Sequence, residues 1–176
     1  RLKINTVIQR GVNDHCVEQL AEHFRGTGHE LRLIEFMDVG NLNHWTRAQV
    51  LPNAELLRRI HARWPLRPIA GPRGSATALR YEYEDGMGAV GFISSITEPF
   101  CGACTRARVT ADGTFHGCLF SSRGTLLRPL LRQFEDDRRL LDYLAGLWAG
   151  REDRYSELRD AQVSERERVE MYRVGG

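Results

Sequence analysis

This 176-residue sequence has few cysteines, a single lysine and no long apolar run. No segment approaches the roughly 20 apolar residues that a membrane span needs, and no charged-then-apolar leader opens the chain. We therefore expect a cytoplasmic protein with no membrane association. The chain starts at Arg1 inside a strand-like run, from which we expect a truncated N-terminus. Its 41% hydrophobic and 27% charged residues exclude a disordered chain and allow one core or two small domains.

Lysine is almost absent, since Lys3 is the one lysine among 25 basic residues and the others are all arginine. Codon usage in a GC-rich genome is the plain explanation for this bias. Arginine nevertheless brings a permanently charged, planar fork that fits phosphates and carboxylates. The formal net charge of only +2 argues against a general nucleic-acid binder.

The cysteines are too few and too unevenly spaced for a disulfide framework. Cys101, Cys104 and Cys118 fall within 18 residues, whereas Cys16 stands alone. Clustered cysteines in a cytosolic chain more often bind metal. Cys16 lies beside a helical apolar stripe, so we expect it to be a small buried hydrophobic residue.

The first 40 residues predict a strand–helix–strand unit. Residues 2–9 alternate with a period of two, residues 17–24 have helical spacing, and residues 31–37 are mostly apolar. This repeat is typical of parallel α/β folds, whose sheets are covered on both faces. One face of the first strand is nonetheless polar, with Lys3 and Asn5 on it. That face is either an inner wall that meets a ligand or a solvent-exposed edge strand.

The rest of the chain predicts a mixture of helices and hairpins. A loop is expected at 38–45 and a linker or long loop at 65–78. Hairpin turns are expected at Asp85–Gly86 and Asp112–Gly113. The remaining expected elements are helices at 53–64 and 138–148 and strands at 79–83, 89–95, 106–110 and 114–120.

The chemistry lies in the segment Pro99-Phe-Cys-Gly-Ala-Cys-Thr-Arg-Ala-Arg108 and in Cys118, which a hairpin folds back toward it. Three thiolates in this spacing fit a structural zinc site in which His116 is the fourth ligand. They also fit a 4Fe–4S cluster with three cysteine ligands and one iron open to substrate. A cluster of cysteines without metal is the third interpretation.

A basic collar surrounds these cysteines. Residues 101–134 carry five arginines against Asp112 alone, a local net charge of +4 that leaves −2 for the rest of the chain. Arg106 and Arg108 share one face of the expected strand, and two adjacent forks suit a polyphosphate. Solvated surface charge is the plain alternative. A structural zinc ribbon does not need this collar, whereas a site that brings an anionic substrate to an open iron does.

At this point the sequence resembles the GTP 3′,8-cyclase family, the radical S-adenosylmethionine enzymes of the lyase class that act in molybdenum cofactor biosynthesis. The resemblance runs nearly from end to end, and its Cys-x2-Cys-x13-Cys spacing and terminal Gly175–Gly176 are specific. The other segments that carry it are residues 3–8, 11–14, 32–40, 91–95, 99–108, 111–113, 117–120 and 169–171.

The resemblance implies an α/β fold with two parts. Residues 1–45 would form the last strands and helices of an incomplete TIM-type radical S-adenosylmethionine barrel. Residues 46–176 would form a C-terminal α+β region that carries a 4Fe–4S cluster and binds GTP through its open iron. In this family a 5′-deoxyadenosyl radical abstracts a hydrogen from the GTP ribose. The carbon radical then attacks C8 of guanine, giving 3′,8-cyclo-7,8-dihydro-GTP for molybdopterin.

The resemblance also implies roles for individual residues. The cluster ligands would be Cys101, Cys104 and Cys118. Contacts to S-adenosylmethionine would come from Met37 and Asn5, and a tail inserted in the active site from Gly175 and Gly176. The predicted GTP-binding residues are Lys3, Arg32, Arg106, Ala107 and Arg108.

One departure from the family pattern affects activity. The sequence contains no Cys-x3-Cys-x2-Cys loop, so the radical-generating 4Fe–4S cluster would lie upstream of Arg1. We therefore expect a C-terminal portion that is inactive alone and whose partners are GTP and the N-terminal radical S-adenosylmethionine half. Cyclic pyranopterin monophosphate synthase would act downstream, and a homodimer stays open. The alternative function is a zinc-ribbon module that binds a nucleotide or RNA.

Overall fold

The computed structural model describes residues 1–71, 73–121, 123–134, 136–159 and 169–173, which group into two compact units. The first unit comprises Arg1–Met37 and Trp45–Ala103, and the second comprises Asp38–His44 and Cys104–Gly176. The short segment Asp38–His44 therefore leaves the first unit and packs with residues that come much later in the chain. The division at residue 45 implied by the resemblance stays a prediction.

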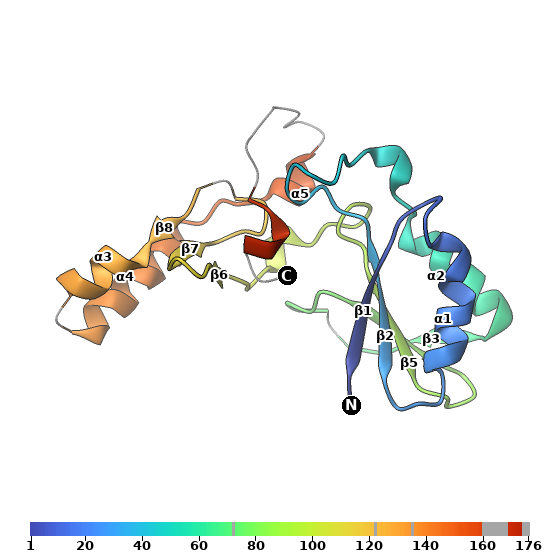
Figure 1. The fold of residues 1–176 in the computed structure, drawn as a ribbon. Helices are drawn as coiled ribbons and strands as arrows, with labels where there is room; N and C mark the ends of the chain where they lie inside the picture. Colours follow the sequence, from blue (N-terminus) through green and yellow to red (C-terminus); the bar gives the residue numbers. More distant parts are fainter. Residues whose placement is uncertain (72, 122, 135, 160–168, 174–176) are drawn as a thin grey trace. The chain divides into compact units, whose positions relative to one another are not determined.

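A five-stranded mixed sheet organises the first unit (Figure 1). The order across the sheet is β1-β2-β5-β4-β3, with β1, β2 and β5 parallel and the last two strands antiparallel to their neighbours. The predicted α/β class is confirmed at this level. The strand bounds are Lys3–Ile8 for β1, Glu30–Glu35 for β2, Leu66–Pro68 for β3, Leu79–Tyr83 for β4 and Ala89–Ile93 for β5.

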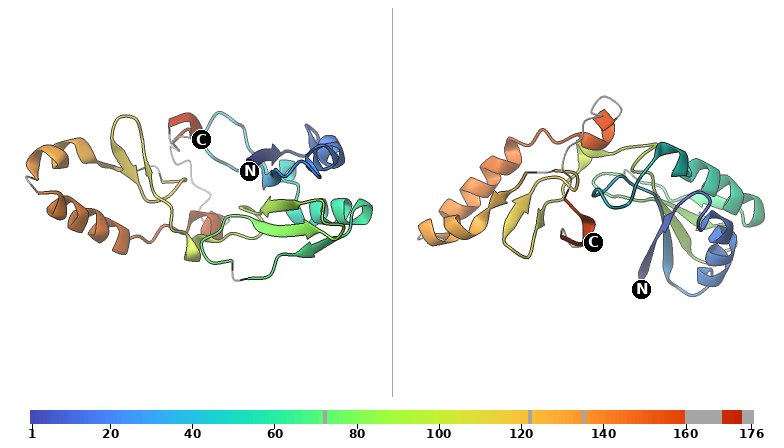
Figure 2. Two further views of the ribbon diagram at one scale, coloured as in Figure 1. Left: turned by 90° about the horizontal axis from the view of Figure 1, so that it is seen from below. Right: turned by 45° about the horizontal axis from the view of Figure 1, so that its top comes forward.

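Two helices, α1 (Val17–Phe24) and α2 (Asn53–Arg63), pack together on one face of this sheet (Figures 1 and 2). Short 3-10 turns, η1 (Asp14–Cys16) and η2 (Arg47–Gln49), precede them. The core between helices and sheet consists of the residues that the strand and helix periods turn inward. These include Ile8, Val17, Ala21, Leu31, Leu33, Leu51, Leu56, Ile60, Val90 and Phe92.

The linker predicted at 65–78 is partly wrong, because residues Leu66–Pro68 form β3 at the sheet edge. Pro68 has no N–H to donate, which an edge strand tolerates. Cys16 is half-buried rather than fully buried, because it belongs to η1 at the entrance of α1.

The second unit contains a three-stranded antiparallel sheet of β6 (Arg108–Val109), β7 (Thr114–His116) and β8 (Thr125–Leu126). Its helices are α3 (Leu127–Gln133), α4 (Asp137–Ala149) and α5 (Tyr155–Leu158), and a 3-10 turn, η5, spans Met171–Arg173. The hairpin predicted around Asp112–Gly113 is confirmed, but its strands are shorter than expected. In the described part of the chain, no helix is long and apolar enough to cross a membrane.

Asp38 anchors the inserted segment in the second unit. Its carboxylate is 1% exposed and accepts hydrogen bonds from the Tyr155 hydroxyl at 2.6 Å and from Nε of Arg159 at 3.0 Å. The Tyr155 ring stacks on Phe120, and the Arg159 guanidinium lies 5.4 Å from both ring centroids. A buried acid thus has two polar partners, as its desolvation requires.

Candidate functional site

Cys104 and Cys118 lie in the second unit, on the two sides of the β6–β7 hairpin. Cys104 follows the 3-10 turn η3 (Cys101–Ala103), and Cys118 lies two residues beyond β7. The hairpin pairs Arg108 with His116 and closes at the Asp112–Gly113 turn. This pairing turns the chain back, so the segment that precedes β6 and the segment that follows β7 run side by side.

Hydrogen-bond donors point at both sulfur atoms. Arg106 donates from Nη2 to Sγ of Cys104 at 3.2 Å, and the Phe120 backbone N–H donates to Sγ of Cys118 at 3.5 Å. Burial raises the pKa of the Cys104 thiol. The backbone N–H and charge of Arg106, together with Arg151, lower this pKa by more than burial raises it, so the net pKa is below its ordinary value. These surroundings stabilise a thiolate, the form that binds metals.

The electrostatic surroundings of the Arg108 guanidinium include both Cys104 and Cys118. Burial and the nearby charge of Arg106 lower the pKa of the Arg108 guanidinium, while Cys118 and Cys104 act in the opposite direction. Both thiols therefore lie within electrostatic reach of one half-buried cation. Ala107, between the two arginines, is exposed, whereas Arg106 and Arg108 are half-buried. Of these three residues only Arg108 lies in β6, so the predicted shared strand face of the two arginines stays a prediction.

Arg151 joins the two cysteine-bearing segments through their backbones. Its Nη2 donates to the Cys104 carbonyl at 2.6 Å, and its Nη1 donates to the Gly117 carbonyl at 3.2 Å. The guanidinium also lies over the Trp148 ring, 4.2 Å from its centroid. Local spacing gives no sign of Arg151, because it is far from both cysteines in sequence.

The predicted metal ligands do not all fall within one unit. Cys101 is grouped with the first unit, whereas Cys104 and Cys118 belong to the second. Among the described residues, no group of three or more His, Cys, Asp or Glu side chains is arranged to hold a metal ion. His116 is 5% exposed, and its Nδ1 is buried without a hydrogen-bond partner. The three-cysteine ligand set and the zinc alternative with His116 both stay predictions.

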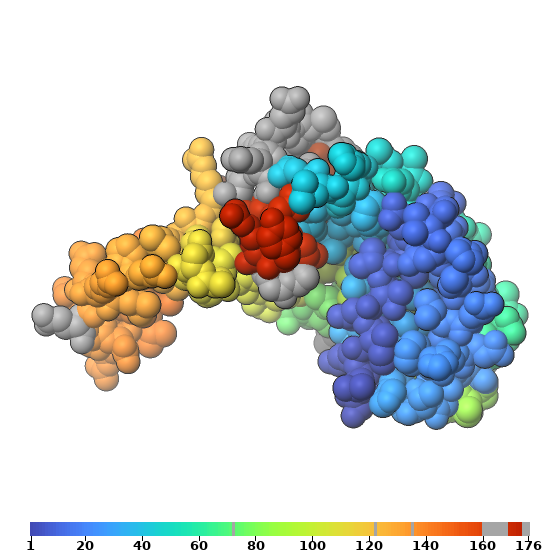
Figure 3. Space-filling view, in the orientation of Figure 1, coloured from blue at the N-terminus to red at the C-terminus, as the bar shows by residue number. Residues whose placement is uncertain are grey.

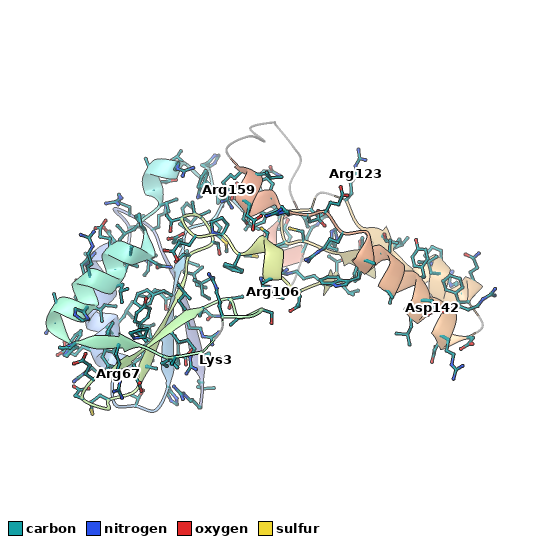
Figure 4. The ribbon with its side chains drawn as sticks, turned by 180° about the vertical axis from the view of Figure 1, so that it is seen from behind. Lys3, Arg67, Arg106, Arg123, Asp142 and Arg159 are labelled. Atoms are coloured by element: carbon teal, nitrogen blue, oxygen red, sulfur yellow. The ribbon has the colours of Figure 1, made fainter. Side chains whose placement is uncertain are left out.

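In the first unit, the strands place three of the predicted residues on the sheet face opposite α1 and α2. Lys3 and Asn5 are exposed on β1, the edge strand, and Asn5 pairs in register with Arg32 on β2. Figure 4 shows the labelled Lys3 on this sheet. Met37 follows two residues after β2 and is half-buried. The first strand is thus an edge strand of the sheet. Its polar residues share one sheet face with Arg32 of the neighbouring strand β2.

Glu30 is a functional candidate that the sequence analysis missed. This β2 carboxylate is 1% exposed and accepts hydrogen bonds from Nε of Arg32 at 2.8 Å and Nε of Arg80 at 2.9 Å. Arg1 lies 3.5 Å away. Burial raises the pKa of Glu30, but the hydrogen bonds and charges of Arg32 and Arg80 lower it more, so the net pKa falls below 4.5. Glu30 therefore fixes the direction of Arg32.

Glu35, at the other end of β2, was also missed. Its fully buried carboxylate accepts backbone N–H groups of Asn53 at 3.0 Å, and of Ile96 and Thr97 at 2.9 Å each. The Thr97 hydroxyl donates to it at 2.5 Å. This carboxylate ties the start of α2 to the segment that follows β5. Both glutamates stand at the ends of β2, a strand whose residues Leu31 and Leu33 are buried, and this placement was the available signal.

Gly175 and Gly176 lie outside the described residues, so their predicted role is not tested. The segment before them is held in the second unit. Oε1 of Glu170 accepts the Asn41 backbone N–H at 2.7 Å, and Figure 3 shows the C-terminal segment, in red, at this place. Gly40 has φ +75°, a left-handed conformation that favours glycine, and a Cβ there would crowd the Glu170 carboxylate.

Comparison with known proteins gives a consistent family match. A family model described as Molybdenum Cofactor Synthesis C matches residues 29–157. The chain is 51% identical over 176 residues to the GTP 3′,8-cyclase of Xanthomonas campestris pv. campestris (strain B100), covering 100% of this chain and 51% of that protein. It is 54% identical over 175 residues to the GTP 3′,8-cyclase of Synechococcus sp. (strain CC9605), covering 99% and 49% respectively. The chain thus spans about half the length of the curated relatives it matches.

Proposed function

The chain belongs to the Molybdenum Cofactor Synthesis C family, and on that premise we propose that it is the substrate-binding portion of a GTP 3′,8-cyclase. The whole enzyme would convert GTP to 3′,8-cyclo-7,8-dihydro-GTP as a radical S-adenosylmethionine lyase. Its N-terminal half would supply the radical-generating cluster. The identity to relatives named GTP 3′,8-cyclase, which extends over essentially the whole chain, supports this proposal.

The observation that carries the proposal is the pair of thiols in a cationic surrounding. Arg106 donates directly to the sulfur of Cys104, and Arg151 donates to the carbonyl of Cys104 and to the carbonyl of Gly117, the residue before Cys118. A structural zinc site needs no such surplus of positive charge, whereas a polyanionic substrate beside metal-bound thiolates does. The second unit therefore favours an anion-binding centre over a purely structural one.

The proposed ligands of a 4Fe–4S cluster are Cys101, Cys104 and Cys118, and the chemistry around two of them supports this proposal. The donor set is sulfur, the Cys104 pKa is lowered, and a backbone N–H reaches the sulfur of Cys118. Hydrogen bonds to cluster sulfurs are among the means by which proteins tune such centres. When bound, a cluster with three protein ligands offers one iron for substrate coordination. Met37 and Asn5 are proposed contacts of S-adenosylmethionine.

Basic residues are the proposed contacts of GTP. Arg106 and Arg108 would bind the triphosphate as planar forks, and the exposed Ala107 between them leaves its backbone accessible. Lys3 and Arg32 are the proposed contacts from the first unit, where Glu30 orients Arg32. The parallel strands β1, β2 and β5 would continue into the incomplete TIM-type barrel of the whole enzyme.

Anaerobic reconstitution of the intact enzyme with iron and sulfide tests this function. We expect a brown protein whose cluster retains its iron when S-adenosylmethionine is absent and whose electron paramagnetic resonance spectrum changes when GTP is added. The variant Cys104→Ser should lose only the GTP-responsive part of the signal. A colourless protein that binds stoichiometric zinc and no GTP would instead support the zinc-ribbon module and contradict the proposal.

A further inference from the structure

One guanidinium connects the two cysteine-bearing segments of the second unit. Arg151 donates to the carbonyl of Cys104, 47 residues away, and to the carbonyl of Gly117, 34 residues away. The second carbonyl belongs to the residue that directly precedes Cys118. Both bonds are partly buried, at 2.6 Å and 3.2 Å, so water competes weakly for the acceptors.

The arrangement uses properties that are specific to arginine. Its planar fork presents separate Nη1 and Nη2 donors, which reach two carbonyls at once, whereas a lysine ammonium is a compact point charge on a flexible stem. The Trp148 ring, 4.2 Å from the guanidinium carbon, supports the plane of that fork. A Cβ at Gly117 would lie 3.2 Å from Cδ of Arg151, so glycine lets the arginine stem pass close to the hairpin backbone.

Arg154 provides a comparison, because it is an exposed arginine in the same segment. Arg154, three positions later, has its side chain 62% exposed and forms an ion pair with Glu157 in the adjacent turn of helix. Arg151, by contrast, reaches across the fold to two backbone acceptors. The positive charge of Arg151 also helps to lower the pKa of the Cys104 thiol, after the larger contribution of Arg106.

We propose that Arg151 is a positioning residue that fixes the segment of Cys104 against the segment of Cys118, so that the two thiols are held ready for one metal centre. The inference rests on the proposed function, because it states how the predicted ligand set is held. Arg151 acts through the two cysteine segments and touches neither substrate nor cofactor in this role.

Titration of the metal-free, reduced intact enzyme with Co²⁺ tests the proposal without measuring turnover. Thiolate-to-cobalt charge-transfer absorbance reports ligation, and the part of it that is absent in Cys104→Ser belongs to this site. We expect Arg151→Gln to weaken Co²⁺ binding about 10- to 100-fold, the range typical of residues that orient metal ligands. Arg151→Lys, which keeps the charge but cannot bridge two carbonyls, should recover only a small part of this loss.

Arg154→Gln is the matched control, since it removes the same charge from the same segment. Its Co²⁺ affinity should stay within about twofold of wild type because an exposed ion pair contributes little. Thermal unfolding followed by circular dichroism shows whether each variant is folded. If Arg151→Gln does not fold, the comparison of Arg151→Lys with wild type decides the question.

Two results would overturn the inference. A folded Arg151→Gln protein with wild-type Co²⁺ affinity would show that the two hydrogen bonds of Arg151 are dispensable. Wild-type Co²⁺ affinity in Arg151→Lys would show that the positive charge alone suffices. If the wild-type protein gave no Cys104-dependent signal, the inference and the proposed ligand set would both be wrong. A cluster that assembles normally but ignores GTP would contradict the proposed function and leave the role of Arg151 intact.

Discussion

At the scale of single residues, the two arginines of the Cys104 segment differ in their surroundings. Both are half-buried, but Arg106 donates to the Cys104 sulfur, whereas Arg108 lies within electrostatic reach of Cys104 and Cys118. Sequence spacing treats them as a matched pair of phosphate forks. The structure separates them: Arg106 contributes to the sulfur environment, and Arg108 is the better candidate for binding an anionic substrate without a direct bond to sulfur.

Replacing Arg108 by alanine should therefore weaken GTP binding about 10- to 100-fold while the cluster content stays unchanged, because charge-assisted hydrogen bonds contribute about 1.5–3 kcal/mol each. Equilibrium binding of GTP to the reconstituted enzyme, with iron analysis of the same samples, measures this. Arg123→Ala removes an exposed arginine of the collar and should change GTP affinity little. Loss of iron in Arg108→Ala would make Arg108 part of the cluster environment instead.

Glu30 gives a prediction about pH. Its folded-state pKa lies below its usual 4.5, so the charged carboxylate stabilises the fold above pH 4.5 and this stabilisation is lost as the pH falls through the folded pKa. Glu30→Gln should lower the free energy of unfolding by about 1–3 kcal/mol at neutral pH. Urea unfolding at several pH values should show the gap to wild type narrowing below pH 4.5. Glu82→Gln, at an exposed ion pair with Arg67, should leave the pH dependence unchanged.

At the scale of secondary structure elements, β2 organises the first unit from both of its ends. Glu30 orients arginines at its start, and Glu35 gathers backbone N–H groups from α2 and from the segment after β5 at its end. The apolar residues between them pack under the helices. One strand thus fixes both the polar face of the sheet and the loops at its carboxyl edge.

Glu35→Gln should destabilise the protein by about 3 kcal/mol, because an amide offers only one acceptor oxygen to the four hydrogen bonds that the buried carboxylate accepts. The free energy of unfolding from urea titration measures this loss. Glu55→Gln is the control, since Glu55 is an exposed partner of Arg10 on α2 and should change stability by no more than about 0.5 kcal/mol. Equal losses in both variants would argue against a special role for Glu35.

The sequence predicts the elements better than their side-chain partners. Alternation and helical spacing identify β1, α1, β2 and α2 because the apolar faces of these elements follow one period. The edge strand β3 is not predicted, because it is only three residues long and the prolines and glycines in and around it are typical of loops. The site shows the same limit. Cys104, Cys118 and Arg108 are found from local spacing. Arg151 and Glu35, by contrast, bind backbone groups that are distant in sequence, and Glu30 binds the distant Arg80 as well as the nearby Arg32.

At the scale of the whole molecule, the chain passes between its two units three times. The first unit is built from two separate stretches of the chain, because the segment Asp38–His44 between them packs in the second unit. Asp38 holds this excursion through Tyr155 and Arg159, and Glu170 accepts the Asn41 backbone N–H. The second unit is therefore complete only when its early segment and its late helices are both present.

Asp38→Asn should loosen the second unit and leave the first largely intact. Breaking a buried, hydrogen-bonded ion pair from one side costs about 3–5 kcal/mol, since the Arg159 charge keeps its burial without its partner. Hydrogen exchange measured by mass spectrometry should rise in residues 38–44 and around α5, and not in β1 and β2. Asp142→Asn, on the exposed side of α4, is the control (Figure 4), and faster exchange throughout the protein would contradict the prediction.

The interleaved chain also sets an order of events during synthesis. Asp38 emerges from the ribosome 121 residues before Arg159, its charged partner. Until then the nascent chain can close its five-stranded sheet but must keep residues 38–44 hydrated outside it. A translation product that stops before residue 159 therefore lacks the arginine that pairs with Asp38 in the segment 38–44. We expect proteases to cleave an unfinished chain within residues 38–44 more readily than a finished one, because segments that are not tied down are the preferred sites of cleavage.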